Sequence, residues 1–165
     1  LENANAFYMA DIWRDPTPFR DDTANFPSLV LCDVYSEKRH QGKKTGMPLL
    51  YYRARTQYTE QDYLDTNTGS GLEIADDIYY YPDNYNLLAL QTPDEQLDHP
   101  LAENGGVDAP QNWENFQNMI INEQVQGSSG MKRPYRANSY ILISAGKDGA
   151  YGSADDLTNF QRETR

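Results

Sequence analysis

Short apolar runs separated by long polar stretches are the feature that most constrains the fold of this chain. The runs occupy residues 28–35, 48–55, 78–81 and 138–144. Each has the length of a strand, and each is enriched in β-branched or aromatic residues, which favour strands. We therefore expect four short strands, the first two paired antiparallel across the charged, glycine-containing turn at residues 37–46.

Helical patterns are fewer. The clearest covers residues 113–125, where Trp113, Phe116 and Ile120 share one face, a proline start signal lies at Pro110, and glycines follow at residues 127–130. We expect this aromatic face to pack in the core. A looser helical pattern covers residues 1–13 and ends before two prolines, which cannot continue a helix. Together these elements predict one α+β domain over residues 1–165, with few helices and a small antiparallel sheet.

The composition narrows the possible classes of function. The chain has 25 Asp and Glu against 14 Lys and Arg, for a net charge of −11, and its mean hydropathy is −0.83. Nucleic-acid binding needs a basic surface, so no nucleic-acid partner is expected. The single cysteine, Cys32, lies inside an apolar run, and we interpret it as a small buried hydrophobic residue. The chain contains no run of about 20 apolar residues that could span a membrane.

An acidic, glycine-rich segment directly follows the last predicted strand. It holds the carboxylates Asp148, Asp155 and Asp156, with glycines at 146, 149 and 152 that can turn backbone carbonyls inward, and Ser144 can add another oxygen. Calcium binds six to eight such oxygen ligands at about 2.3–2.6 Å and would relieve the repulsion between the carboxylates. The residues alone leave two interpretations open, a calcium loop and an Asp-Gly turn with solvated carboxylates.

Other metals and the EF-hand fit this segment less well. It contains no His or Cys, the ligands that zinc, copper and iron prefer. Its acidic residues also lack the spacing of an EF-hand loop.

No catalytic motif is present, and we expect the protein not to be an enzyme. The sequence has no Gly-x-Ser-x-Gly, no phosphate-binding glycine loop and no His-Glu-x-x-His. Neither His40 nor His99 has a ligand partner four residues on. The acidic pairs at 76–77 and 155–156 are adjacent in the chain, whereas glycosidase carboxylates face each other across a substrate.

A binding module is the alternative. The sequence has thirteen tyrosines, and several of them could line a sugar-binding face. The candidates are Tyr51, Tyr52, Tyr79, Tyr80 and Tyr81. Because neighbouring strand residues point to opposite faces, only some of them can be exposed. The competing interpretation is that these rings pack on both faces of the sheet.

The C-terminal sequence resembles a known family. Arg133-Pro-Tyr135 is followed by the strand at residues 139–144, then by Ser-Ala-Gly-Lys-Asp-Gly at 144–149 and Asp-Asp-Leu-Thr-Asn-Phe at 155–160. This pattern of about 30 residues resembles the end of type II secretion pseudopilins, especially those with a tail like that of the major pseudopilin. The segment 46–54, Gly-Met-Pro-Leu-Leu-Tyr-Tyr-Arg-Ala, is more weakly similar to prepilin-like proteins.

The resemblance implies a pilin-like fold and a structural role. It implies an N-terminal helix packed on a small antiparallel sheet, and a calcium ion that rigidifies the C-terminal loop. Asp148, Asp155 and Asp156 would supply carboxylate ligands, with Ser144 and a carbonyl near Tyr151 as further oxygens. The partners would be other pseudopilin subunits, in a homopolymer or heteropolymer.

The resemblance also implies a location. Such a subunit is periplasmic or extracellular and is anchored to the inner membrane before assembly. The anchor would be an N-terminal helix upstream of Leu1, and we expect that helix to be missing from this sequence. The greater length of residues 55–130 than in a minimal major pseudopilin leaves open a minor pseudopilin or a related pilus system.

Overall fold

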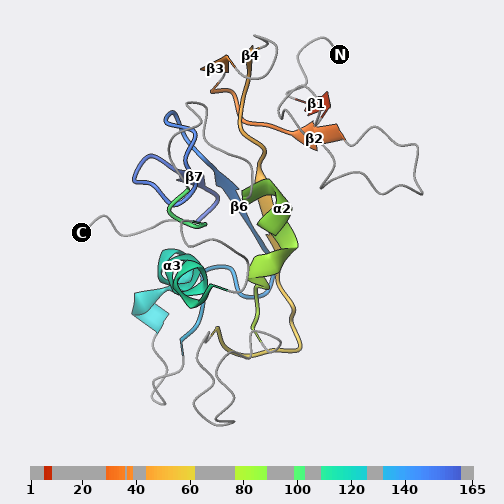
Figure 1. The fold of residues 1–165 in the computed structure, drawn as a ribbon. Helices are drawn as coiled ribbons and strands as arrows, with labels where there is room; N and C mark the ends of the chain where they lie inside the picture. Colours follow the sequence, from red (N-terminus) through yellow and green to blue (C-terminus); the bar gives the residue numbers. More distant parts are fainter. Residues whose placement is uncertain are drawn as a thin grey trace.

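A computed structural model of the chain describes residues 6–8, 29–35, 37–38, 44–61, 77–88, 99–102, 109–125 and 132–160 (Figure 1). Its strands are β1 (Ala6–Tyr8), β2 (Leu29–Leu31), β3 (Glu37–Lys38), β4 (Lys44–Thr45), β5 (Leu50–Arg53), β6 (Tyr140–Ser144) and β7 (Leu157–Thr158). Its helical segments are the α-helices α2 (Tyr85–Leu88) and α3 (Pro110–Ile120) and the 3-10 helices η4 (Tyr81–Asn84) and η5 (Glu123–Val125). None of the helices in these ranges is long and apolar enough to cross a membrane.

The main sheet is antiparallel, with strand order β5-β6-β7. Leu50 pairs with Ile143 and Tyr52 with Ile141, and all four side chains are fully buried. Tyr51 and Arg53, the alternate residues of β5, are exposed. Side chains alternate between the two faces of a strand, so one face of the sheet lies on the core and the other faces outward. The predicted α+β class and the strands within residues 48–55 and 138–144 are confirmed.

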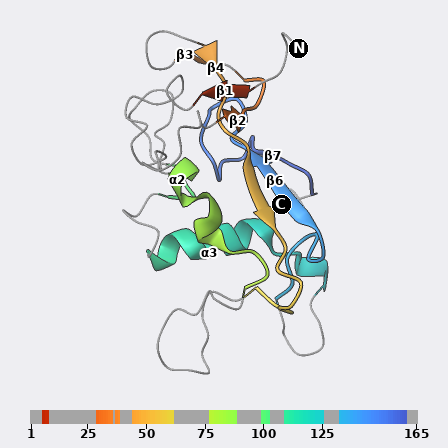
Figure 2. The same cartoon turned by 90° about the vertical axis from the view of Figure 1, so that its right-hand side faces the viewer.

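Helix α3 covers the inner face of the sheet. Pro110 is at its first turn, where a missing N–H costs nothing, so the start signal at this proline is confirmed, although the helix begins before the predicted range of 113–125. Trp113, Phe116 and Ile120 are buried, as their spacing predicts, and the rings of Phe116 and Tyr52 lie 4.6 Å apart. Figure 2 shows α2 to the left of the strands β6 and β7, and α3 running across the view toward the strands.

Helix α3 ends at Ile120, five residues earlier than predicted. Ile121 has an extended backbone and forms a bridge with Pro134. The Asn122 amide donates to the Arg133 carbonyl at 3.0 Å, so pairing with a distant segment replaces the next helical turn. Residues 123–125 then form the 3-10 helix η5.

The helix expected over residues 1–13 is wrong at residues 6–8. These residues form β1, which pairs antiparallel with β2 through Phe7 and Val30. The pairing supplies backbone hydrogen bonds that a loosely amphipathic segment would otherwise take from its own turns, and tertiary context overrides weak helical patterning. The other residues of the predicted helix lie outside the described ranges.

The predicted pairing of residues 28–35 with residues 48–55 is only partly correct. It exists where the two segments meet, at the Cys32–Pro48 bridge and in a 2.8 Å hydrogen bond from the Leu49 amide to the Leu31 carbonyl. Beyond this point β5 pairs with β6, while β3 and β4 pair across the predicted turn. Cys32 is buried, as expected.

The strand predicted at residues 78–81 is wrong. Ile78 and Tyr79 lie in a bend, and Tyr81 begins η4, with Pro82 at a position in the first turn that suits proline. The Tyr79 amide donates to the side-chain oxygen of Gln61 at 2.8 Å, and the Gln61 side chain donates back to the Tyr79 carbonyl at 3.1 Å. A glutamine side chain therefore takes the place of a neighbouring strand.

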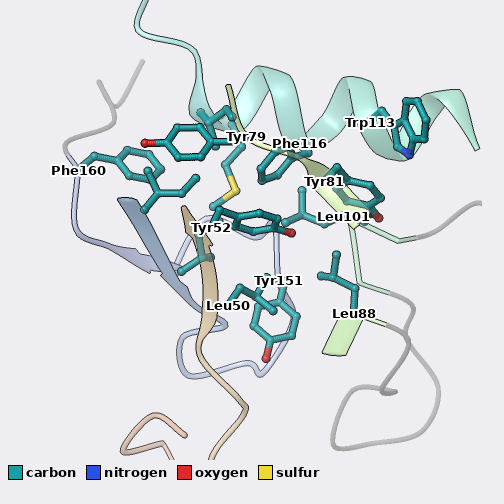
Figure 3. Close-up of a cluster of buried hydrophobic side chains, with 14 of the residues drawn as sticks. Leu50, Tyr52, Tyr79, Tyr81, Leu88, Leu101, Trp113, Phe116, Tyr151 and Phe160 are labelled. Carbon is teal, nitrogen blue, oxygen red and sulfur yellow. Dashed lines mark hydrogen bonds between the residues drawn. The ribbon is translucent and has the colours of Figure 1, made fainter. Parts of the chain in front are cut away.

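Four tyrosines contribute to the buried core, and Figure 3 shows Tyr151 beside Leu50. Tyr52, Tyr79, Tyr81 and Tyr151 are all at most 2% exposed. The Tyr79 hydroxyl donates to the Arg136 carbonyl at 2.7 Å, and the Tyr81 hydroxyl donates to the Leu101 carbonyl at 2.5 Å. Burial raises the pKa of Tyr79 to about 12 and raises the pKa of Tyr52 and of Tyr81 well above the ordinary range.

Candidate metal-binding loop

The acidic glycine loop connects two paired strands. It leaves β6 after Ser144 and enters β7 at Leu157, which pairs directly with Ser144. Its ends are thus held by the sheet, and its three glycines all have positive φ: 65° at Gly146, 73° at Gly149 and 95° at Gly152. This conformation is strained for other residues, so the glycine spacing noted in the sequence is required by the turn.

Gly146 is also required for space. A Cβ at this position would lie 2.5 Å from the backbone carbonyl oxygen of Asp155, closer than van der Waals contact allows. The segment that leaves β6 and the segment that enters β7 are therefore in contact, with the Asp155 carbonyl lying against Gly146.

Asp155 organises the turn. Its Oδ2 accepts from the backbone amides of Lys147 at 2.7 Å and Asp148 at 3.2 Å, and its Oδ1 accepts from the Ser153 hydroxyl at 2.6 Å. The carboxylate is exposed. The hydrogen bond from Ser153, followed by the two backbone amides, lowers the pKa of Asp155 below its usual value.

Asp148 and Asp156 also accept backbone amides of the loop. Asp148 is exposed, and its Oδ1 accepts from the Ala150 amide at 2.8 Å. Asp156 is buried, and its Oδ2 accepts from the Gly152 amide at 2.8 Å. Asp148 and Asp155 are neighbours, whereas within the described ranges no three Asp, Glu, His or Cys side chains form a group that could hold a metal ion.

Ser144 and Tyr151 anchor the loop to the rest of the fold. The Ser144 hydroxyl donates to Asp33 Oδ2 at 2.9 Å and accepts from the Gly146 amide at 3.3 Å, so it points toward Asp33. Tyr151 is fully buried, and its hydroxyl donates to the Pro48 carbonyl. Its carbonyl accepts from the Leu101 amide at 3.2 Å.

Two residues that contact the loop, Asp33 and His99, were not expected at this site. Asp33 is buried, and its Oδ1 accepts from the amides of Tyr35 and Met47, while its Oδ2 accepts from Ser144. His99 is buried, and its Nδ1 accepts from the Tyr151 amide at 3.2 Å. A signal for Asp33 was present, because an acidic residue inside an apolar run needs hydrogen-bond donors when it is buried. His99 offered no comparable local signal.

The donor chemistry of the loop fits a hard cation. Every side chain expected to bind the metal offers oxygen, and two exposed carboxylates, Asp148 and Asp155, lie together. Each carboxylate has about four lone-pair sites, so those that accept amides keep capacity for a cation. Asp148, Asp155 and loop carbonyls are the oxygen groups that could contribute to a calcium site, and Asp156 lies on the buried side of the turn.

The five tyrosines considered for a sugar-binding face do not share a surface. Tyr52, Tyr79 and Tyr81 lie in the core, and Tyr80 is half-buried with the Arg55 guanidinium 4.9 Å from its ring centroid. Only Tyr51 is exposed, at 50%. Its neighbour on the outer face is Tyr140, a residue of β6, with ring centroids 5.8 Å apart.

Of the acidic pairs considered for catalysis, Asp77, Asp155 and Asp156 lie within the described ranges. The buried Asp77 accepts, through its backbone carbonyl, the Arg55 guanidinium at 2.6 and 2.9 Å, while Asp76 lies outside the described ranges. His40 lies outside them as well. Comparison with protein-family models, curated proteins and solved structures found no match to this chain.

Proposed function

We propose that this chain is a structural subunit of a type II secretion pseudopilus or a related pilus-like fibre, and that a calcium ion stabilises its C-terminal loop. The observation that carries the proposal is the oxygen-lined glycine loop held between β6 and β7. The resemblance of residues 133–160 to pseudopilin tails supports the same conclusion. The small antiparallel sheet supports the proposal, whereas the helix that packs on it, α3, lies at residues 110–120, and β1 stands where the N-terminal helix was expected.

The role of calcium would be electrostatic and not catalytic. The cation would offset the repulsion between Asp148 and Asp155 and would bind only the folded loop, so its binding energy would add to the stability of the fold. Because the loop joins β6 to β7 and reaches Asp33 through Ser144, a tighter loop would stabilise the edge of the sheet. The subunit would act in the periplasm or outside the cell, anchored to the inner membrane by an N-terminal helix before it joins other subunits.

The first test is a thermal melt of the chain in calcium, in magnesium and in chelator. Calcium at about 100 times its dissociation constant stabilises a folded protein by about 2.7 kcal/mol, which corresponds to a rise of several degrees in Tm. We expect this rise with calcium and a much smaller one with magnesium, because magnesium demands stricter octahedral geometry and loses its water reluctantly.

The informative variant is Asp155→Asn. The amide oxygen can still accept from the loop amides, so the Tm in chelator should fall only slightly, while the calcium-dependent rise should largely disappear. Glu60→Gln, which removes an exposed charge outside the loop, is the matched control and should keep the full rise. Equal calcium responses in wild type and Asp155→Asn would place the ion elsewhere. If calcium does not raise the Tm of wild type, the loop is an Asp-Gly turn with solvated carboxylates.

A further inference from the structure

Exposed apolar side chains gather on the outward face of the main sheet. Of the six large hydrophobic residues exposed in the described ranges, three lie there: Tyr51 at 50%, Tyr140 at 40% and Leu157 at 55%. Tyr51 pairs with the half-buried Leu142, and the rings of Tyr51 and Tyr140 lie 5.8 Å apart. We define the outer face by these four residues together with Arg53 and Arg136.

The two arginines make the outer face cationic. Arg53 pairs with Tyr140 in the sheet, and the Arg136 guanidinium lies 5.8 Å from the Tyr140 ring centroid. Both arginines are exposed, and within the described part of the chain neither forms an ion pair with a carboxylate. The strands β5, β6 and β7 contain no acidic residue. A chain with a net charge of −11 therefore presents a locally positive, apolar surface here.

Arg136 also has a strained backbone. Its φ is 52°, and among the described residues it is the one non-glycine residue with positive φ. Glycine or asparagine adopts this conformation more readily than arginine. The Arg136 carbonyl accepts from the Ser139 amide at 2.8 Å and from the Tyr79 hydroxyl at 2.7 Å, so the contacts that hold this turn use backbone atoms of residue 136.

The strain favours a binding role for the Arg136 side chain. Residues with strained backbones concentrate at functional sites, where the side chain is needed in one place. The guanidinium that this strain retains lies at the Tyr140 ring, and its own hydrogen bond, to the Asn159 carbonyl at 3.3 Å, is exposed. Backbone strain and surface composition are separate observations, and both identify the outer face.

We propose that the outer face binds an acidic segment of another protein. Its carboxylates would pair with Arg53 and Arg136, because guanidinium groups bind carboxylates through two parallel hydrogen bonds. Its apolar side chains would pack on Tyr51, Tyr140 and Leu157, and tyrosine and arginine carry much of the binding energy of protein interfaces. This inference goes beyond the proposed function and does not depend on a calcium ion in the loop.

The chemistry of the outer face favours a protein over a polysaccharide. A sugar presents many hydroxyl donors, and these need acceptors such as carboxylates or amides. The outer face has no Asp, Glu, Asn or Gln, and its arginines only donate. Its two leucines instead offer aliphatic contact, which apolar side chains of a protein would use.

The test is calorimetric titration of the chain with a random copolymer of glutamate and tyrosine. Chelator is present, so calcium held by the copolymer does not contribute. We expect binding that is weaker for polyglutamate, which lacks the aromatic rings, and weaker in 1 M salt, where the screening length is about 3 Å. Overall charge cannot produce this binding, because chain and copolymer are both acidic.

Variants locate the binding on the outer face. Arg53→Gln and Tyr51→Ala should each weaken it by about tenfold, through the loss of a charged hydrogen bond and of an aromatic contact respectively. Lys132→Gln removes the same charge as Arg53→Gln from an exposed residue outside the outer face. This control should bind like wild type, and an equal loss of affinity in Lys132→Gln would overturn the proposal.

Arg136→Asn is the decisive variant. Asparagine accepts the positive φ but lacks the guanidinium, so binding should weaken by about tenfold while the Tm is kept or rises by up to about 2–4 °C. A merely structural role for Arg136 predicts the opposite pattern, with a lower Tm and unchanged binding. That pattern would overturn the proposal.

Three outcomes with the wild-type chain would also overturn it. One is no binding of the copolymer at about 1 mM chain. Another is self-association that Tyr51→Ala abolishes, which would identify a second copy as the partner. The third is tighter, Tyr51-dependent binding of polygalacturonate, which would identify a glycan. The calcium-dependent rise in Tm should be the same in all outer-face variants, so either proposal can fail while the other stands.

Discussion

Tyr51 and Tyr52 are adjacent on β5, yet they lie in opposite environments. Tyr52 is fully buried on the inner face, with its ring 4.6 Å from Phe116 of α3. Tyr51 is half exposed on the outer face and lies beside Tyr140. The same residue type thus lies in the core on one face and at the surface on the other, so the number of tyrosines says little until each is assigned to a face.

The largest expected difference between the faces is in stability. Tyr52→Ala should lower the free energy of unfolding by about 3–5 kcal/mol, because it removes a buried ring and leaves a cavity against α3. Tyr51→Ala should cost less than about 1 kcal/mol. Urea denaturation of both variants measures this, and similar losses would mean that the two faces are equally packed.

Alkaline titration offers a second comparison between buried and exposed tyrosines. The pKa of Tyr79 is about 12 in the folded protein and about 10 when unfolded. A raised pKa gives stability that is complete below pH 10 and is lost as pH rises toward 12, with a loss on the order of 2–3 kcal/mol. The free energy of unfolding should therefore fall by this amount between pH 10 and pH 12.

Tyr79→Phe sharpens the alkaline test. It cannot ionise, so its stability should fall less steeply between pH 10 and 12 than that of wild type, although it loses the hydrogen bond to Arg136 at neutral pH. Tyr51→Phe is the matched control on the outer face. Circular dichroism measured against pH follows unfolding. Parallel curves for Tyr79→Phe and wild type would contradict the prediction that ionisation of Tyr79 destabilises the fold.

A smaller effect is expected at the edge of β5 that lies away from β6. The buried Asn84 side chain accepts from the Tyr51 amide at 3.3 Å and donates to the Tyr51 carbonyl at 2.6 Å, as a neighbouring strand would. Asn84→Ala should cost about 1–3 kcal/mol, because these backbone groups lose their partner. Hydrogen exchange should show faster exchange of the Tyr51 amide, and unchanged protection would show that the amide does not depend on Asn84.

Predictions from the sequence succeeded where a local requirement decided the structure. Pro110 starts α3 because its fixed φ suits a first turn, and the strands within residues 48–55 and 138–144 follow from short apolar runs. Predictions failed where a distant partner decided it. β1 pairs with β2, and the Gln61 side chain holds Tyr79 in place of a strand.

The same distinction between local requirements and distant partners holds for the candidate site. The order of glycines and aspartates identified the loop, because positive φ at Gly146, Gly149 and Gly152 is a local property of the turn. The contacts that anchor the loop were not predictable, since Asp33 is 111 residues from Ser144 and His99 is 52 residues from Tyr151.

Local sequence patterns predict the α+β class, the position of the oxygen-rich loop and the acidic net charge of −11. All three follow from properties of short segments: hydrophobic periodicity, the backbone freedom of glycine and the identity of charged residues. The tertiary contacts, in contrast, settle which tyrosines lie in the core, that Ser144 points toward Asp33, and that α3 packs on the inner face of the sheet. These outcomes depend on which segments pack together, and packing is set by burial of the whole chain and not by any one segment.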